Sequence, residues 1–90
     1  MAEIEVEHRD GDRYRVRVRD DTGSSEHMVT ATESQLRDLG ATGRARELLE
    51  ESFRFLLERE PRSAIMSTFD LPTISRFFPS YPDEIRERLD

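Results

Sequence analysis

The sequence predicts an α+β fold: a three-stranded antiparallel meander (β-β-β), then a short helix, a long central helix and two to three short C-terminal helices. Three observations carry this prediction. Apolar and charged residues alternate along 3–9 and again along 13–19, which is typical of half-buried strands. Residues 43–60 instead carry apolar side chains at helical spacing and stop before Pro61. Beyond Pro61, further prolines divide the chain into short turns.

The composition indicates one small domain with a thin core. The chain has 90 residues, of which 34% are hydrophobic and 38% charged. A chain of this length buries only about 60–65% of its unfolded surface. We expect a single α+β domain over residues 1–90, with a sheet in 1–32, helices in 33–60 and a helical cap in 61–90.

Charge and composition exclude several classes of function. The formal net charge of −6 argues against a general nucleic-acid binder and against docking to anionic membranes. Cysteine is absent, so disulfides and thiolate chemistry are excluded. The sequence shows no signal peptide and no long apolar run, so we expect a cytoplasmic protein without a membrane partner.

The loop Asp10-Gly11-Asp12 sets the register of the first two strands. A two-residue loop would place Val6 opposite Arg15 and split the apolar faces, so we predict a three-residue loop. Asp12 must then take the left-handed conformation, and Arg9 faces Arg13. The predicted cross-strand pairs are Ile4 with Val18, Val6 with Val16, His8 with Tyr14, Glu3 with Arg19, Glu5 with Arg17, and Glu7 with Arg15.

The third strand is expected over residues 26–31, after a two-residue loop at Gly23-Ser24. That loop pairs Val18 with Val29 and keeps the apolar residues of the third strand on the core face. A helix should follow at once, because Thr32 and Gln35 form a capping-box pattern. It should extend to Leu39 and be closed by Gly40.

The central helix should begin at Gly43, with Thr42 as its N-cap, and end near Glu60. Its apolar arc spans roughly 180–200°, wider than the ~100° stripe of an ordinary surface helix. We therefore expect the sheet to cover one flank and the C-terminal segment the other. Ser52 lies inside this arc, and we expect its hydroxyl to bond the backbone one turn back rather than to act as a nucleophile.

The C-terminal segment should consist of short helical turns. Ser63 is expected to cap a turn that runs through Phe69. Asp70 is placed to cap a helix over about 71–78, with a proline in its first turn. A last helix is expected over about 82–89, with acidic residues in its first turn.

Two residue groups could carry an alternative function. In the predicted register His27 lies beside Asp20, which could orient the imidazole as a general base in a small enzyme; His8 lies about 20 Å away. Arg13, Arg15, Arg17 and Arg19 form a basic row that could contact nucleic acid weakly. Glutamates opposite this row neutralise it and no aromatic lies on the same face. A lone histidine–carboxylate pair is also a weak signal, so we favour neither alternative. We expect no catalytic, cofactor-binding or metal-ligating residues.

The segment 77–82 holds the most unusual local feature, three aromatic residues within five positions together with two prolines. These aromatics either complete the core or form a rigid patch for a partner, since aromatic residues and arginine are enriched at interfaces. Both edges of the sheet also remain available for strand pairing. The candidate interaction patch consists of Arg76, Phe77, Phe78 and Tyr81.

The run SFRFLLEREP at residues 52–61 and the later FDLPTISRFFPSY at 69–81 carry a resemblance. Together they look like a family of small, stand-alone bacterial proteins, of actinobacterial type, with an SFxFLLEREP…FDLPxIxRxFPxY signature. The resemblance implies no activity and no functional residues. The leading hypothesis is therefore a non-enzymatic protein-interaction or regulatory accessory module that acts on an unknown protein partner or on a second copy of itself.

Overall fold

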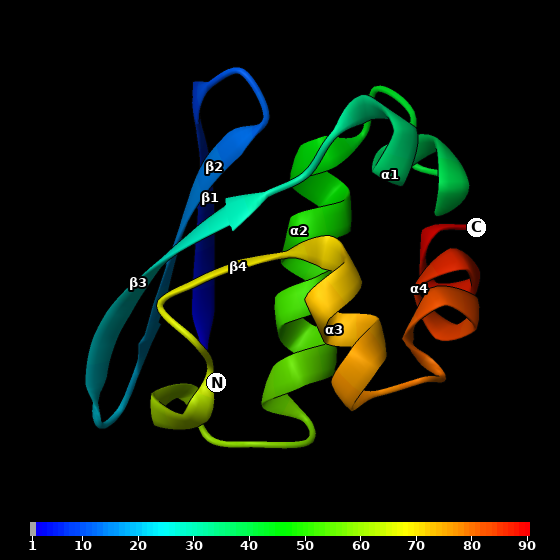
Figure 1. Ribbon diagram of the computed structural model, residues 1–90. Helices are drawn as coiled ribbons and strands as arrows, with labels where there is room; N and C mark the ends of the chain where they lie inside the picture. Colours follow the sequence, from blue (N-terminus) through cyan, green and yellow to red (C-terminus); the bar gives the residue numbers. More distant parts are fainter. Residues whose placement is uncertain (1) are drawn as a thin grey trace.

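The computed structural model describes residues 2–90 and has an α+β architecture, with a mixed sheet on one side and helices on the other (Figure 1). Over these residues the sheet has four strands in the order β1-β2-β3-β4, instead of the three expected. In chain order the elements are β1 (Glu3–Asp10), β2 (Arg13–Asp20), β3 (Gly23–Thr30), α1 (Glu33–Asp38), α2 (Ala45–Leu57), the 3₁₀ helix η1 (Arg62–Ala64), β4 (Thr68–Asp70), α3 (Leu71–Phe77) and α4 (Tyr81–Leu89).

The first hairpin has the predicted pairs from Glu3 with Arg19 to His8 with Tyr14. Its turn differs from the prediction. Gly11 takes the left-handed conformation, with φ 53°, and Asp12 does not. Asp10 pairs with Arg13, and the register shifts between His8 and Asp10, so Arg9 does not face Arg13. A two-residue loop at Gly11-Asp12 and the predicted apolar register are thus both possible, because a bulge absorbs one residue.

The second hairpin is antiparallel as expected, but its predicted register is wrong. Val18 pairs with Ser25 rather than Val29, and Val29 pairs with Tyr14. The loop is Asp21-Thr22, and the Asp20 carboxylate stabilises it by accepting from the Thr22 backbone N–H at 2.8 Å. The error is four residues, an even number, so every side chain of β3 keeps its predicted face.

Helix α1 has the predicted N-terminal capping box, in which Thr32 and Gln35 exchange side-chain and backbone hydrogen bonds. Its C-terminus is closed by Gly40, which has φ 72°. There the N–H of Ala41 donates to the carbonyl of Leu36 at 2.8 Å, in the pattern of a Schellman motif.

Helix α2 is shorter than predicted at both ends. Gly43 has φ 75°, which a helix does not accept, so α2 begins at Ala45 and Thr42 is not its N-cap. Arg44 occupies that position without a side-chain hydrogen bond to the backbone. At the other end α2 finishes at Leu57, and residues 58–60 form a turn before Pro61.

Two opposite sides of α2 are buried, as its wide apolar arc predicts. It packs against β1 on one side and α4 on the other (Figure 1). Phe53 faces the sheet, where its ring lies 5.3 Å from that of His27 and 6.0 Å from that of Phe69. Phe55, two residues on and therefore about 200° round the helix, lies 5.3 Å from the ring of Tyr81. Both phenylalanine side chains are fully buried.

Strand β4 is the largest departure from the predicted helical cap. Residues 68–70 pair in parallel with 28–30 of β3, so Ser63 does not cap a turn that reaches Phe69. The short helix η1 ends at Ala64 instead. Parallel pairing to β3 requires a long crossover, which helices α1 and α2 supply. One edge of the predicted three-stranded sheet is therefore covered, and β1 and β4 are the edge strands.

Helices α3 and α4 lie close to where the sequence places them. Asp70 caps α3 as predicted: its carboxylate accepts from the Thr73 backbone N–H at 3.2 Å and from the Thr73 hydroxyl at 2.6 Å. Helix α4 begins at Tyr81, one residue before the predicted start.

The Asp70 cap provides a stability test of the segment that carries α3. Replacement Asp70→Ala removes the acceptor and should lower the free energy of unfolding by about 1 kcal/mol, whereas Asp70→Asn keeps an acceptor oxygen and most of the stability. Urea denaturation of the three proteins measures both values. Equal stability of the alanine and asparagine variants would show that the cap contributes nothing.

Candidate functional site

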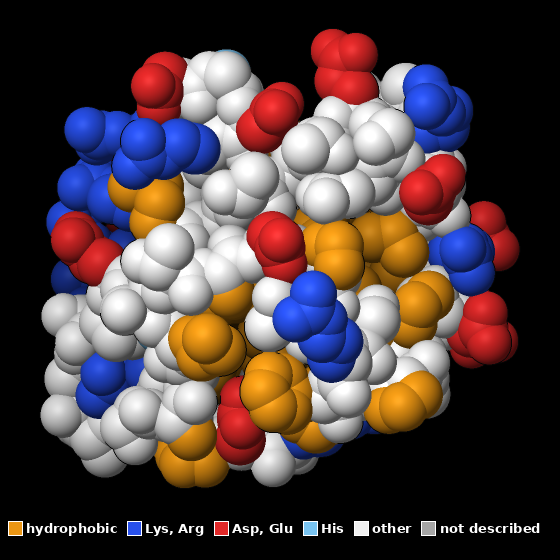
Figure 2. Space-filling view, viewed as in Figure 1, with side chains coloured by type: hydrophobic (Ala, Val, Ile, Leu, Met, Phe, Trp, Pro, Cys, Tyr) orange, Lys and Arg blue, Asp and Glu red, His pale blue; other side chains and the backbone are white. Residues whose placement is uncertain are grey.

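An apolar groove of about 290 Å³ lies between α3, the end of α2 and the segment that follows η1. Figure 2 shows several hydrophobic side chains on this face, with acidic and basic side chains between and around them. We call it the Phe77 groove. It is lined by Leu56, Glu60, Ala64, Ile65, Met66, Phe69, Thr73, Ile74, Phe77 and Phe78.

The two exposed large hydrophobic side chains of the described chain both line this groove. Phe77 is 68% exposed and Met66 is 50% exposed. Phe77 is the last residue of α3, whereas Met66 lies between η1 and β4. Ile74 and Phe69, which are buried, also line the groove and anchor it to the core. The sequence analysis did not identify Met66 as a candidate site residue. A flexible apolar side chain outside any helical pattern could have indicated it.

Glu60 is the charged side chain among the groove-lining residues. Its carboxylate and the net charge of −6 make the groove complementary to apolar groups that are flanked by basic ones. The lining side chains include no cysteine, histidine or lysine, and Glu60 and Thr73 are the polar residues among them.

The structure divides the predicted interaction patch between surface and core. Arg76 and Phe77 are exposed, and Phe78 is half-buried against the ring of Phe55 at 5.8 Å. Tyr81 is fully buried, so its inclusion in a surface patch was wrong. It turns inward because it begins α4, the helix that covers α2.

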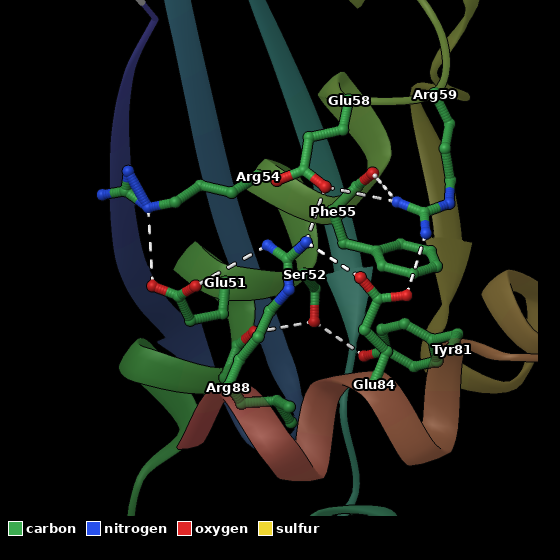
Figure 3. A network of polar contacts seen from close by, with 10 residues as sticks. Glu51, Ser52, Arg54, Phe55, Glu58, Arg59, Tyr81, Glu84 and Arg88 are labelled. Atoms are coloured by element: carbon green, nitrogen blue, oxygen red, sulfur yellow. Dashed lines mark hydrogen bonds and ion pairs between the residues drawn. The ribbon is translucent and has the colours of Figure 1, made fainter. Parts of the chain in front are cut away.

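Tyr81 instead takes part in a buried polar chain (Figure 3). The Ser52 hydroxyl donates to the Leu48 carbonyl at 2.6 Å, which confirms the expected bond to the preceding turn. Since a carbonyl only accepts, the Tyr81 hydroxyl must donate to Ser52, also at 2.6 Å. Burial raises the pKa of Tyr81 to about 12, and this phenol stays protonated near neutral pH.

Charged side chains surround the outer side of the same contact (Figure 3). The Arg59 guanidinium lies over the Phe55 ring, 3.7 Å from its centre, and bonds Glu84 at 2.9 Å. Arg88 bonds Glu58 at 2.6 Å and Glu84 at 3.1 Å. The bond from Arg88 lowers the pKa of the Glu58 carboxyl. These pairs join the C-terminal end of α2 to α4.

Removal of the two hydroxyls of the buried chain should have unequal costs. Ser52→Ala leaves the Tyr81 hydroxyl buried without its acceptor and should cost about 1–3 kcal/mol of unfolding free energy. Tyr81→Phe should cost less, about 1 kcal/mol, because Ser52 keeps its bond to Leu48. The double variant should resemble Tyr81→Phe. Chemical denaturation of the wild type, both single variants and the double variant measures these losses. If the loss of the double variant equals the sum of the two single losses, Tyr81 does not depend on Ser52 as its acceptor.

The predicted pairing of His27 with Asp20 is not formed. His27 pairs with Val16, and Asp20 pairs with Gly23. Four residues of an extended strand separate Val16 from Asp20, which places them about 13 Å apart. Asp20 instead bonds Arg62 at 3.2 Å and Thr22. The predicted His27–Asp20 pair depended on the predicted register of the second hairpin, which is wrong. The structure therefore does not provide the geometry for an enzyme based on this pair.

The His27 ring is buried and held in one tautomer. The Met66 carbonyl lies 2.8 Å from Nδ1 and can only accept, so Nδ1 carries the proton. Nε2 therefore accepts from the Ser25 hydroxyl, also at 2.8 Å. Desolvation, with the charge of Arg62, lowers the pKa of His27 below its ordinary value of 6.5. Through Met66 this neutral ring joins β3 to the groove segment.

A lowered His27 pKa makes stability depend on pH. The unfolded chain takes up the proton at a higher pH than the folded one, so the contribution to stability is complete above pH 6.5. It is lost as the pH falls through 6.5 towards the lowered folded pKa. Wild-type unfolding free energy should therefore fall between pH 7.5 and pH 5.5, measured by urea titration, and His27→Gln should show a smaller slope. Identical slopes would contradict the assignment.

The arginine face of β2 is largely neutralised by ion pairs. Arg19 bonds Glu3 at 2.8 Å and Arg15 bonds Glu7 at 3.3 Å, as the predicted register implies. Arg17 bonds Glu26 of β3 at 2.8 Å, although its Cα partner on β1 is Glu5. These pairs weaken the attraction of the face for phosphate.

Within residues 2–90, no group of three or more histidine, cysteine or carboxylate side chains is placed to hold a metal ion. None of the described helices is both long and apolar enough to cross a membrane. Comparison of the chain with protein-family models, curated proteins and solved structures finds no match. The bacterial family resemblance stays a prediction.

Proposed function

We propose that the protein is a cytoplasmic, non-enzymatic interaction module whose Phe77 groove holds an apolar segment of a partner protein. One observation carries this proposal: Phe77 and Met66, the exposed large hydrophobic residues of residues 2–90, line the same groove. Scattered exposed apolar residues are ordinary, but apolar residues gathered at a groove are typical of binding sites.

The buried walls of the groove explain why it can bind rather than collapse. Ile74 and Phe69 are fixed by the core and by β4, so the floor is preorganised. Phe77 is held at the end of a capped helix, which places an aromatic anchor at the rim. Apolar anchors of this kind contribute much of the affinity at protein interfaces.

Glu60 and the net charge of −6 define the partner further. A segment with an aliphatic or aromatic side chain next to lysine or arginine fits both the groove and its carboxylate. A second copy of the chain carries the same net negative charge, so self-association is the less favoured use of the groove.

Peptide selection tests this function directly. Peptides selected from a random phage-displayed library against the wild-type protein should be rich in apolar residues flanked by lysine or arginine. Their affinity, measured by calorimetry, should fall about tenfold with Phe77→Ser, a loss of roughly 1.4 kcal/mol.

The matched control is Glu87→Ser on the exposed side of α4, which should bind the peptides as wild type does. Because Phe77 is 68% exposed, its replacement should leave unfolding nearly unchanged. Selected peptides that bind the Phe77→Ser protein equally well would contradict the proposal. Dimerisation through the groove would appear as a Phe77-dependent mass in light scattering.

A further inference from the structure

Strand β1 presents the longest exposed edge of the sheet. It runs over eight residues, Glu3–Asp10, and in residues 2–90 no strand pairs with its outer side. The opposite end of the sheet is protected differently: β4 is three residues long, and Arg62 bonds Asp20 and Thr22 at the tip of the second hairpin. A long edge with open backbone groups is a template for another strand.

The exposed face of β1 carries a row of glutamates, Glu3, Glu5 and Glu7. Glu3 and Glu7 have arginine partners on β2, whereas Glu5 has no ion pair among the described residues. The next row, on β2, is entirely arginine in this stretch. A strand added outside β1 would therefore lie beside carboxylates along most of its length, and basic side chains would complement them.

The core-side face of β1 also lacks a complete cover. Ile4 and Val6 pack against the core but remain half-buried, unlike Val16 and Val18 opposite them, which are fully buried. Apolar side chains on an added strand would extend this layer and cover the two residues. The two faces together specify a strand in which basic and apolar residues alternate.

We propose that the outer edge of β1 binds an extended segment of another protein in which arginine or lysine alternates with apolar residues. On its inner side β1 already pairs with such a sequence, RYRVRVR, at residues 13–19. The proposal is independent of the Phe77 groove. A second copy of β1 is a poor occupant, because antiparallel pairing on matching faces sets Glu5 against Glu5 or Glu7, and like charges directly opposite are destabilising.

The chain supplies its own probe. A fluorescent peptide with the sequence RYRVRVR should bind the intact protein saturably at low salt, as fluorescence anisotropy would show, and the affinity should fall as salt is added. Binding should weaken about tenfold with Glu5→Arg, which replaces one attraction by a repulsion. Glu87→Arg on α4 makes the same change in net charge far from β1 and should leave the affinity within twofold of wild type.

Backbone pairing is tested with a second peptide that has the same side chains but an N-methyl group on every amide nitrogen. It keeps the charge but has no backbone N–H left to donate to β1, and its methyl groups obstruct close approach to the strand edge, so its binding should fall below detection. Bound RYRVRVR should also slow hydrogen exchange at amides of β1.

Equal binding of the N-methylated peptide would overturn the proposal in favour of a purely electrostatic contact. Equal weakening by Glu5→Arg and Glu87→Arg would do the same, because the effect would then follow net charge and not the edge. Loss of binding through Phe77→Ser would move the peptide to the groove and would also refute the edge site. If Glu5→Arg failed to fold, Glu5→Gln would replace it, with an expected loss of a few-fold.

Discussion

The structure depends on the burial of α2 from two opposite sides. Phe53 and Phe55 are two residues apart, so they point about 200° from each other around the helix, and both are fully buried. No single neighbouring layer can cover both. The sheet covers Phe53, and α4 with the Phe78 side chain covers Phe55. The core of this 90-residue chain therefore takes apolar side chains from both layers around α2.

This constraint explains which features of the chain are informative about function. Helix α4 covers α2 with three buried side chains, those of Tyr81, Ile85 and Leu89. The hydrogen bonds from Tyr81 through Ser52 to Leu48 fix the position of α4 on α2. The charged network around Phe55 seals the outer side of that contact. Apolar surface that remains exposed after this use, at Phe77 and Met66, contributes little to the core. Its gathering at one groove is the reason for the proposed binding role.

Periodicity predicted those parts of the fold in which local pattern and burial agree. The β1–β2 register followed from the requirement for one apolar face, and the caps at Thr32 and Asp70 followed from local hydrogen bonding. The β2–β3 register was not determined in this way, because a shift of four residues leaves both faces unchanged. His27 and Asp20 were paired by that register alone, and the predicted dyad failed with it.

Other errors came from interactions that no local pattern contains. Strand β4 has three residues, too few to show alternation, and it forms only because β3 offers a parallel edge. The predicted start of α2 was wrong because Gly43 takes a left-handed conformation, which excludes Gly43 from the helix. In the candidate patch, Arg76 and Phe77 lie at the surface, whereas Tyr81 could be assigned to the core only once α4 was placed.

The most direct measurement is the unfolding of a chain that ends at residue 79 and so lacks α4. With Phe55 and Ser52 uncovered, two-sided burial predicts loss of the cooperative urea transition and of amide dispersion in the NMR spectrum, for the helices and the sheet together. A truncated chain that keeps a cooperative transition and a dispersed spectrum would show that α2 needs only the sheet, and would contradict two-sided burial as the basis of the fold.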